Sequence, residues 1–299
     1  MRQATRGWIN GLIGVLIFSG SLPATRVAVQ GFDPVFLSVA RATIAGLVGL
    51  GLLRAIGGRR PAREDLPPLA IVALGVVIGF PLLTAMALRH VTSAHAIVFI
   101  GLLPLATAIF AVIRAGERPR PAFWVFAALG SGLVAGSAVH QGGGGTRTGD
   151  ALMVAAIVLC GLGYAEGGRL SRRLGGWQVI SWALVLSLPL MIPLCLGLWP
   201  ASLAAVTPAE WIALGYVSLF SMLIGFVFWY RGLAQGGIAS VGQLQLVQPF
   251  FGLALAAVLL GEPVTPGMVV VCMAVIGSVA GARRFARAEP PAIAPRPAR

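Results

Sequence analysis

The sequence contains no lysine and few charged residues of any kind. All 22 basic residues are arginine, 9 residues are acidic, and the charged residues make up 10% of the 299. A soluble domain carries about 25% charged residues, so these side chains cannot cover a water-facing surface of this size. With 58% hydrophobic residues and a mean hydropathy of +0.90, the chain requires a lipid bilayer as its solvent.

Cysteine and known catalytic motifs are equally scarce. Cys160, Cys195 and Cys272 are at least 35 residues apart, which excludes a disulfide framework or a metal-binding spacing, so we expect them to be small packing residues. No Walker phosphate loop, HExxH or GxSxG motif occurs, so neither direct ATP use nor an intramembrane enzyme is expected, and no metal or cofactor. The arginines are scattered between apolar runs, which argues against nucleic-acid binding.

The chain repeats itself at a spacing of 145 residues. The matched positions are Pro104 and Pro249, Gly116-Glu117 and Gly261-Glu262, Pro121 and Pro266, Gly132 and Gly277, and Gly136 and Gly281. The chain is therefore two copies of one unit.

Each copy contains five apolar segments of the length that crosses a bilayer, about 20 residues. The ten predicted spans are roughly 8–29, 34–53, 67–88, 94–113, 122–139, 150–170, 178–199, 210–229, 238–260 and 267–282. Because five is odd, the second copy enters the membrane inverted. The predicted fold is an all-α integral membrane protein of ten transmembrane helices in two inverted five-helix repeats. The predicted domains are a first repeat (7–139), a glycine-rich linker (140–149), a second repeat (150–284) and a disordered tail rich in arginine and proline (285–299).

The arginines also predict the orientation. If both termini are cytoplasmic, 18 of the 22 arginines fall on the cytoplasmic side, as the positive-inside rule requires. The first apolar run is too long for a signal peptide, so we interpret it as the first transmembrane helix.

These features resemble the EamA domains of the drug/metabolite transporter superfamily. The resemblance depends on two five-helix halves, each with a proline in its fourth helix, a Gly-Glu at the end of that helix and a glycine-rich fifth helix. It implies one central cavity and secondary transport, usually the efflux of small metabolites across the bacterial inner membrane. Bacterial family members of this length include exporters of amino acids, and the aromatic amino-acid exporter type is the specific expectation, although the resemblance does not fix the substrate.

Polar residues in the first and ninth spans are the first candidates for substrate binding. Ser19 and Ser21 flank a helix break before Pro23, where a carrier can expose polar backbone, although a simple kink has the same sequence. Gln243, Gln245 and Gln248 precede Pro249, and they serve either as ligands or as hydrogen-bonding contacts between helices. We expect hinges at Pro23, Pro104 and Pro249.

A second group of candidates combines aromatic and titratable side chains. Tyr164, Phe80 and Thr84 are candidates for the cavity wall, whereas Trp229 and Tyr230 also suit the aromatic belt at the membrane surface. Glu166 is a candidate proton carrier, but Arg169 lies one turn away and favours a structural ion pair. His95 is a candidate proton carrier or an interfacial donor.

Three further features are interpreted structurally. Arg41 either binds a carboxylate, snorkels to the membrane surface or pairs with Asp33, and we favour the last two. Glu117 and Glu262 cap a neighbouring helix or pair with arginine. Gly132/Gly136 and Gly277/Gly281 permit close helix packing, either within a monomer or across a homodimer.

The sequence therefore predicts a secondary carrier that works by alternating access. Its predicted substrates are neutral or aromatic amino acids or similar small metabolites. The lipid bilayer is its other predicted partner, and the protein is either a monomer or a homodimer. A carrier for another metabolite or drug class is the alternative. A channel is disfavoured, because an internally duplicated chain lacks the rings of charge or carbonyls that line a filter.

Overall fold

The computed structural model describes residues 2–87, 90, 99–140, 146–248, 250–251, 254–255 and 266–286. This part of the chain contains helices and no strand. Six helical segments are long and apolar enough to cross a membrane: Gln3–Gly31, Pro34–Ala55, Arg63–Thr84, Arg147–Leu174, Gly176–Gly197 and Pro208–Gly236. Shorter apolar helices cover Leu103–Ala115, Pro121–Gly136 and Ile238–Val247. Together with Pro266–Phe285, these segments overlap all ten predicted spans, and the protein is an all-α membrane protein.

Several of these segments are subdivided. In the first half, the elements are α1 (Arg2–Ser19), α2 (Ser21–Gly31), α3 (Pro34–Ala55), η1 (Arg63–Asp65), α4 (Leu66–Val72), η2 (Ala73–Gly79), α5 (Phe80–Ala87), α7 (Leu103–Ala115) and α8 (Pro121–His140). In the second half they are α9 (Arg147–Leu174), α10 (Gly176–Gly197), α11 (Pro208–Gly215), η3 (Tyr216–Ile224), α12 (Gly225–Gly236), α13 (Ile238–Gly242), η4 (Gln243–Val247) and α15 (Pro266–Phe285).

Local sequence signals explain where several helices begin and end. Asp33 caps α3 by accepting hydrogen bonds from the backbone N–H groups of Val35 and Phe36, at 2.9 and 3.1 Å, and Pro34 follows it. Gly116 ends α7 with φ at 66°, a left-handed conformation that favours glycine.

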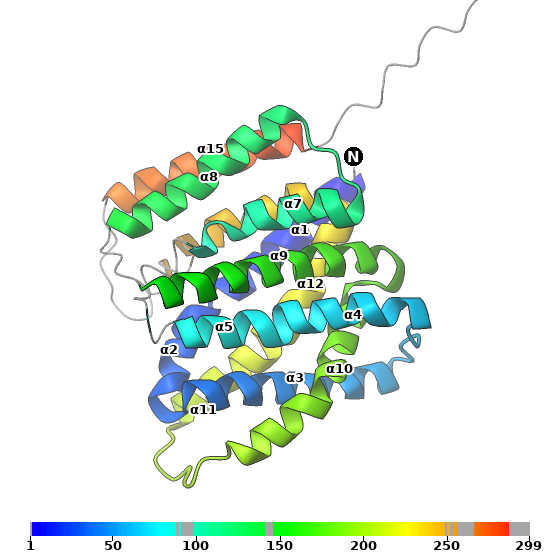
Figure 1. Ribbon diagram of the computed structural model, residues 1–299, viewed down its shortest axis with the longest axis vertical. Helices are drawn as coiled ribbons and strands as arrows, with labels where there is room; N and C mark the ends of the chain where they lie inside the picture. The colour runs from blue at the N-terminus through cyan, green and yellow to red at the C-terminus, as the bar shows by residue number, and fades with distance from the viewer. Residues whose placement is uncertain are drawn as a thin grey trace, which may run out of the picture.

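The two halves pack with an approximate twofold relation. The first helix of each half lies along the third helix of the other, α1 against α12 and α9 against η2 and α5. The second helices pair with each other (α3 with α10), and so do the fifth helices (α8 with α15, the outer layer in Figure 1). The N-terminus and the C-terminal end of α9 lie at one end of the bundle, so α1 and α9 run in opposite directions (Figure 1). This arrangement is the one expected of inverted repeats.

We call that end of the bundle the basic end, because the arginines at the ends of α7, α9 and α15 gather there. The Trp8 indole donates to Ser240 at 3.2 Å, and the Arg283 guanidinium lies 4.4 Å from the centre of the Trp8 ring. The N-terminus and the end of α15 therefore lie together, as the predicted topology requires.

The third helix of each half contains a π-helical segment, which the sequence analysis did not predict. η2 and η3 are both π-helical, and residues 73–79 correspond to 218–224 at the spacing of 145. π-helical turns in membrane helices frequently mark functional sites. Their equivalent placement makes them part of the repeated unit.

Glycine allows close contact between α1 and α12, which the sequence analysis did not predict. A Cβ atom on Gly232 of α12 would lie 2.6 Å from the backbone nitrogen of Gly11 in α1, so only glycine permits this approach. By contrast, no atom of the described residues lies within 4 Å of such an atom on Gly132, Gly136 or Gly277. At these three glycines the structure contradicts packing within the monomer, and the alternative, a face of a homodimer, stays a prediction. Gly281 alone of the four packs against a neighbour, Phe126.

Candidate functional site

Five aromatic side chains from both halves meet in the middle of the bundle. Phe18 of α1 contacts Phe226 and Trp229 of α12, with ring centroids 5.0 and 6.2 Å apart. Tyr164 of α9 contacts the same two rings at 6.0 and 5.6 Å, and Tyr230 lies 5.3 Å from Phe226. We call these residues the aromatic cluster. It lies where α1, α9 and α12 cross, so both repeats build it.

Trp229 and Tyr230 are fully buried, so the aromatic-belt interpretation of them is wrong. The predicted eighth span ended at Trp229, whereas α12 continues to Gly236. Trp229 therefore lies two turns, about 10 Å, inside the helix. Its indole N–H is buried and has no acceptor among the described residues.

Two buried glutamines of η4 have unused acceptors in the described part of the chain, and one of them, Gln245, lies next to the aromatic cluster. Gln243 and Gln245 are buried in η4, and the side-chain oxygen of each has no donor in the described part of the chain. The Gln243 amide donates to the Pro104 carbonyl at 3.5 Å, and the Gln245 amide lies beside the Tyr164 hydroxyl. An unpaired buried polar atom costs about 1–3 kcal/mol, and in a native structure such atoms need an explanation. A bound solute would supply the missing partners.

The serines at the helix break form contacts between helices. The Ser19 hydroxyl donates to the Val15 carbonyl at 2.7 Å and lies 3.3 Å from the Gln248 carbonyl, so it connects the first and ninth spans. The Ser21 hydroxyl donates to Ser221 in η3 at 2.7 Å. The helix is interrupted at Gly20, between α1 and α2. Pro23 has no N–H group that could donate to the carbonyl one turn earlier.

Phe80 and Thr84 lie one turn apart on α5, which packs against α9. Phe80 is half-buried against the core, and the Thr84 hydroxyl is buried without a partner in the described structure. Three other residues interpreted from the sequence, His95, Pro249 and Glu262, lie outside the described residues.

The predicted pairing of Arg41 with Asp33 is wrong. Asp33 is engaged in capping α3, and a terminal nitrogen of Arg41 donates to the Ser221 hydroxyl at 3.3 Å. Arg41 therefore turns toward η3 in the second half rather than toward the membrane surface.

Glu166 forms the structural ion pair that its sequence neighbours indicate. Its side chain is fully buried, and it accepts from Arg169 one turn along α9 and from Arg114 at the end of α7, at 3.0 Å for Arg114. Each arginine side chain is about 40% exposed (41% and 38%), so the pair points toward the basic end. The two arginines explain how a carboxylate can be buried at this position. A role of Glu166 in proton coupling stays a prediction.

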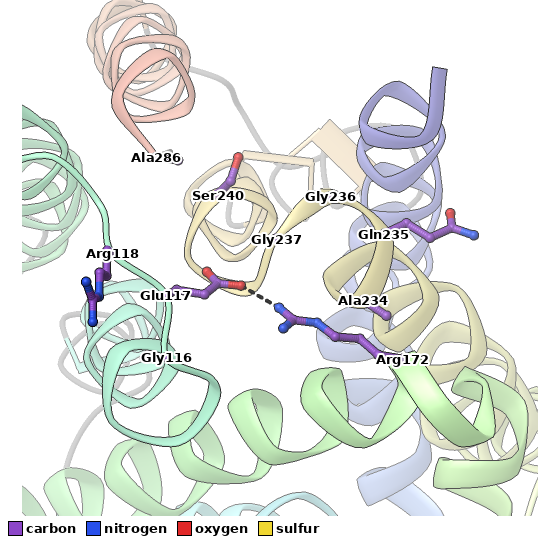
Figure 2. A pocket seen from close by; sticks show the side chains of 10 residues that line it. All are labelled: Gly116, Glu117, Arg118, Arg172, Ala234, Gln235, Gly236, Gly237, Ser240 and Ala286. Atoms are coloured by element: carbon purple, nitrogen blue, oxygen red, sulfur yellow. Dashed lines mark hydrogen bonds and ion pairs between the residues drawn. The ribbon is translucent and has the colours of Figure 1, made fainter. Parts of the chain in front are cut away.

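Glu117 performs both structural roles predicted for it. Its carboxylate accepts from the backbone N–H groups of Ile238 and Ala239, at 2.8 Å each, and so caps α13. It also pairs with Arg172 at the end of α9 at 2.8 Å, across the open space seen in Figure 2. Arg173 pairs with Glu64 and Asp65 at the start of the third span.

Two hollows of the described surface lie at the basic end. One, of about 450 Å³, is lined by Glu117, Arg118, Arg172 and the α12–α13 junction (Figure 2). The other, of about 390 Å³, lies between Glu64, Arg169 and Arg173. Among the described residues, no group of three or more His, Cys, Asp or Glu side chains is arranged to hold a metal ion.

The fold and the site thus define a class: a membrane protein of two inverted helical repeats that enclose buried, unpartnered polar groups. Comparison with known proteins agrees. The EamA-like transporter family matches residues 5–137 and 147–283. The chain belongs to the EamA-like transporter family and is a multi-pass membrane transporter.

Individual proteins similar to this chain are also named as transporters. The chain is 68% identical over 287 residues to an uncharacterized transporter, YdeK, of Bacillus subtilis (strain 168), covering 96% of this chain and 100% of that protein. It is 28% identical to a probable terminal-alkyne amino-acid exporter of Streptantibioticus cattleyicolor, covering 90% of this chain and 89% of the relative. A solved crystal structure superposes with a TM-score of 0.79 at 23% identity, covering 94% of this chain and 98% of that one. At that identity the superposition supports the fold alone.

Proposed function

We propose that this transporter is a secondary carrier that exports neutral amino acids, aromatic ones among them, or similar small metabolites. One observation carries the proposal: buried polar atoms without partners lie beside aromatic rings contributed by both halves. Trp229 offers a donor, and Gln243 and Gln245 offer acceptors. The ammonium group of an amino acid would satisfy the amide oxygens, and its side chain would pack against the rings. The 28% identical relative named as a probable amino-acid exporter supports the same substrate class.

The ion pairs at the basic end suggest how access alternates. Glu117 and Arg114 of the first half pair with Arg172 and Glu166 of the second, so these pairs close the bundle at that end. In our proposal the basic end faces the cytoplasm of a bacterial inner membrane, with both termini inside, and substrate enters when the halves separate there. Pro23, Pro104, Pro249 and the two π-helical segments are the proposed hinges.

The test is counterflow in proteoliposomes with labelled phenylalanine, methionine and threonine. Gln245→Ala and Trp229→Phe should each lower exchange about three- to tenfold, the effect of one lost hydrogen bond to substrate. Each change also removes buried atoms that contact neighbours, such as the Trp229 ring against Phe18 and the Gln245 amide beside Tyr164, so thermal stability is measured for each variant and exchange is compared per amount of folded protein. Gln178→Ala and Trp199→Phe are the matched controls: Gln178 accepts from the backbone of Arg59 at the basic end, and Trp199 is exposed.

Two results would count against the proposal. If the protein exchanges another class of metabolite and no amino acid, the proposed substrate class is refuted, whereas the proposal that the protein is a secondary carrier stands. Equal exchange by Gln245→Ala, Trp229→Phe and the unmodified protein would show that the polar atoms at the aromatic cluster do not contact the solute.

A further inference from the structure

Arg41 occupies a polar junction where three helical segments from both halves meet. It lies two turns, about 10 Å, inside α3. One of its terminal nitrogens donates to the Ser221 hydroxyl of η3 at 3.3 Å, and Ser221 also accepts from Ser21 of α2 at 2.7 Å. We call Arg41, Ser21 and Ser221 the Arg41 junction.

The guanidinium of Arg41 pairs with no anionic group of the described residues. Its Nε is buried and has no acceptor, and among the described residues no carboxylate pairs with Arg41. Asp33, the acidic residue nearest in sequence, is engaged by two backbone N–H groups. A positive charge at membrane depth is costly unless it is paired, and a hydroxyl group cannot neutralise it.

The free groups of the junction match a carboxylate. A guanidinium binds a carboxylate side-on through Nε and a terminal nitrogen, with two parallel hydrogen bonds. Ser221 accepts from both of its neighbours, so its own hydroxyl hydrogen stays free to donate to the same anion.

The junction also adjoins the aromatic cluster. Ser21 follows Phe18 by three residues, and Phe226 follows Ser221 by five, so the two spans that carry the serines, Gln3–Gly31 and Pro208–Gly236, also carry rings of the cluster in their neighbouring elements α1 and α12. Along a helix these separations are about 4.5 and 7.5 Å, comparable to the length of one amino acid. A solute with its carboxylate at Arg41 would place an aromatic side chain at Phe18 and Phe226.

We propose that the Arg41 junction is an anion subsite that binds the carboxylate of the transported solute. The inference rests on the proposed function, since it assigns one end of the same substrate. Because α2 and α3 belong to the first half and η3 to the second, a bound carboxylate bridges the two halves. Its release accompanies their separation.

The experiment measures equilibrium binding to the purified full-length chain. Three probes share a phenyl ring: L-phenylalanine, 3-phenylpropanoate, which has no amine, and phenethylamine, which has no carboxylate. The unmodified protein should bind both carboxylates, and phenethylamine at least tenfold more weakly. R41Q should weaken binding of the carboxylates about ten- to hundredfold, the effect of a lost charged hydrogen bond, and leave phenethylamine unchanged. Arg231→Gln, which removes an exposed arginine at the basic end, should change neither.

Two further variants keep the test valid if R41Q does not fold. R41K retains the charge but not the side-on geometry, and it should bind the carboxylates with intermediate affinity. Ser221→Ala removes the hydroxyl that Arg41 contacts, and it should weaken carboxylate binding about three- to tenfold without changing phenethylamine.

The possible outcomes separate this inference from the proposed function. If the unmodified protein exchanges amino acids but R41Q binds the carboxylates as tightly as the unmodified protein does, the subsite is overturned and the proposed function stands. Arg41-dependent binding of 3-phenylpropanoate without any amino-acid exchange supports the subsite and overturns the substrate. Arg41-dependent binding of chloride alone, or no binding of either carboxylate by the unmodified protein, overturns the subsite.

Discussion

Replacing Glu117 tests how far one carboxylate holds the basic end together. Glu117→Ala removes two hydrogen bonds to the backbone N–H groups of Ile238 and Ala239 and the ion pair with Arg172. Ile238 and Ala239 are fully buried, so water cannot replace the lost acceptor easily. A helix cap contributes about 1 kcal/mol, and each unpaired buried donor costs about 1–3 kcal/mol. We expect the free energy of unfolding to fall by about 2–4 kcal/mol.

Companion variants separate the cap from the ion pair. Glu117→Gln keeps one acceptor oxygen and should lose about half as much stability as Glu117→Ala. Arg172→Gln should lose at most about 1 kcal/mol, because the Arg172 side chain is 42% exposed and such pairs contribute little. Glu64→Gln is the control: Glu64 is also a carboxylate paired with an arginine of α9, but its side chain is 71% exposed and it should change stability by less than about 0.5 kcal/mol.

The assay is equilibrium unfolding in mixed micelles together with hydrogen exchange of the α13 amides. Glu117→Ala should increase exchange at Ile238 and Ala239, whereas Arg172→Gln should leave it unchanged. The reasoning fails if both variants lose the same stability, or if the α13 amides stay protected without the carboxylate.

Two further predictions concern the helix packing and the topology. Gly232→Ala should destabilise the protein by about 1–3 kcal/mol, since its Cβ would meet the backbone of Gly11. Gly215→Ala, where such an atom meets nothing within 4 Å, should be neutral or stabilising in the same thermal-unfolding measurement, and equal losses would contradict the packing. Tags at the two ends of the chain should both be reached only from the cytoplasm in intact cells, and tags on opposite faces would overturn the inverted-repeat topology.

The sequence alone predicted the structural role of Glu117, but it did not predict the burial of Trp229. The Gly-Glu repeat placed a carboxylate at a helix C-terminus, where the helix dipole is unfavourable, so a cap or an arginine had to compensate. For Trp229, the eighth span was predicted to end at that residue, just before Arg231, which suggested the aromatic belt at the membrane surface. That inference failed because α12 continues past the arginine to Gly236 and buries the tryptophan against α1 and α9.

Composition and the spacing of 145 residues determined that the chain is a duplicated helical membrane protein, because hydrophobic length and repeat period are properties of the chain itself. Only the tertiary structure decided which polar groups lie unpaired. Arg41, Ser21 and Ser221 come from different helices, as do Tyr164 and Gln245. Whether such groups form hydrogen bonds with one another or stay unpaired depends on how the helices cross. The hydropathy of the sequence carries no information about how the helices cross.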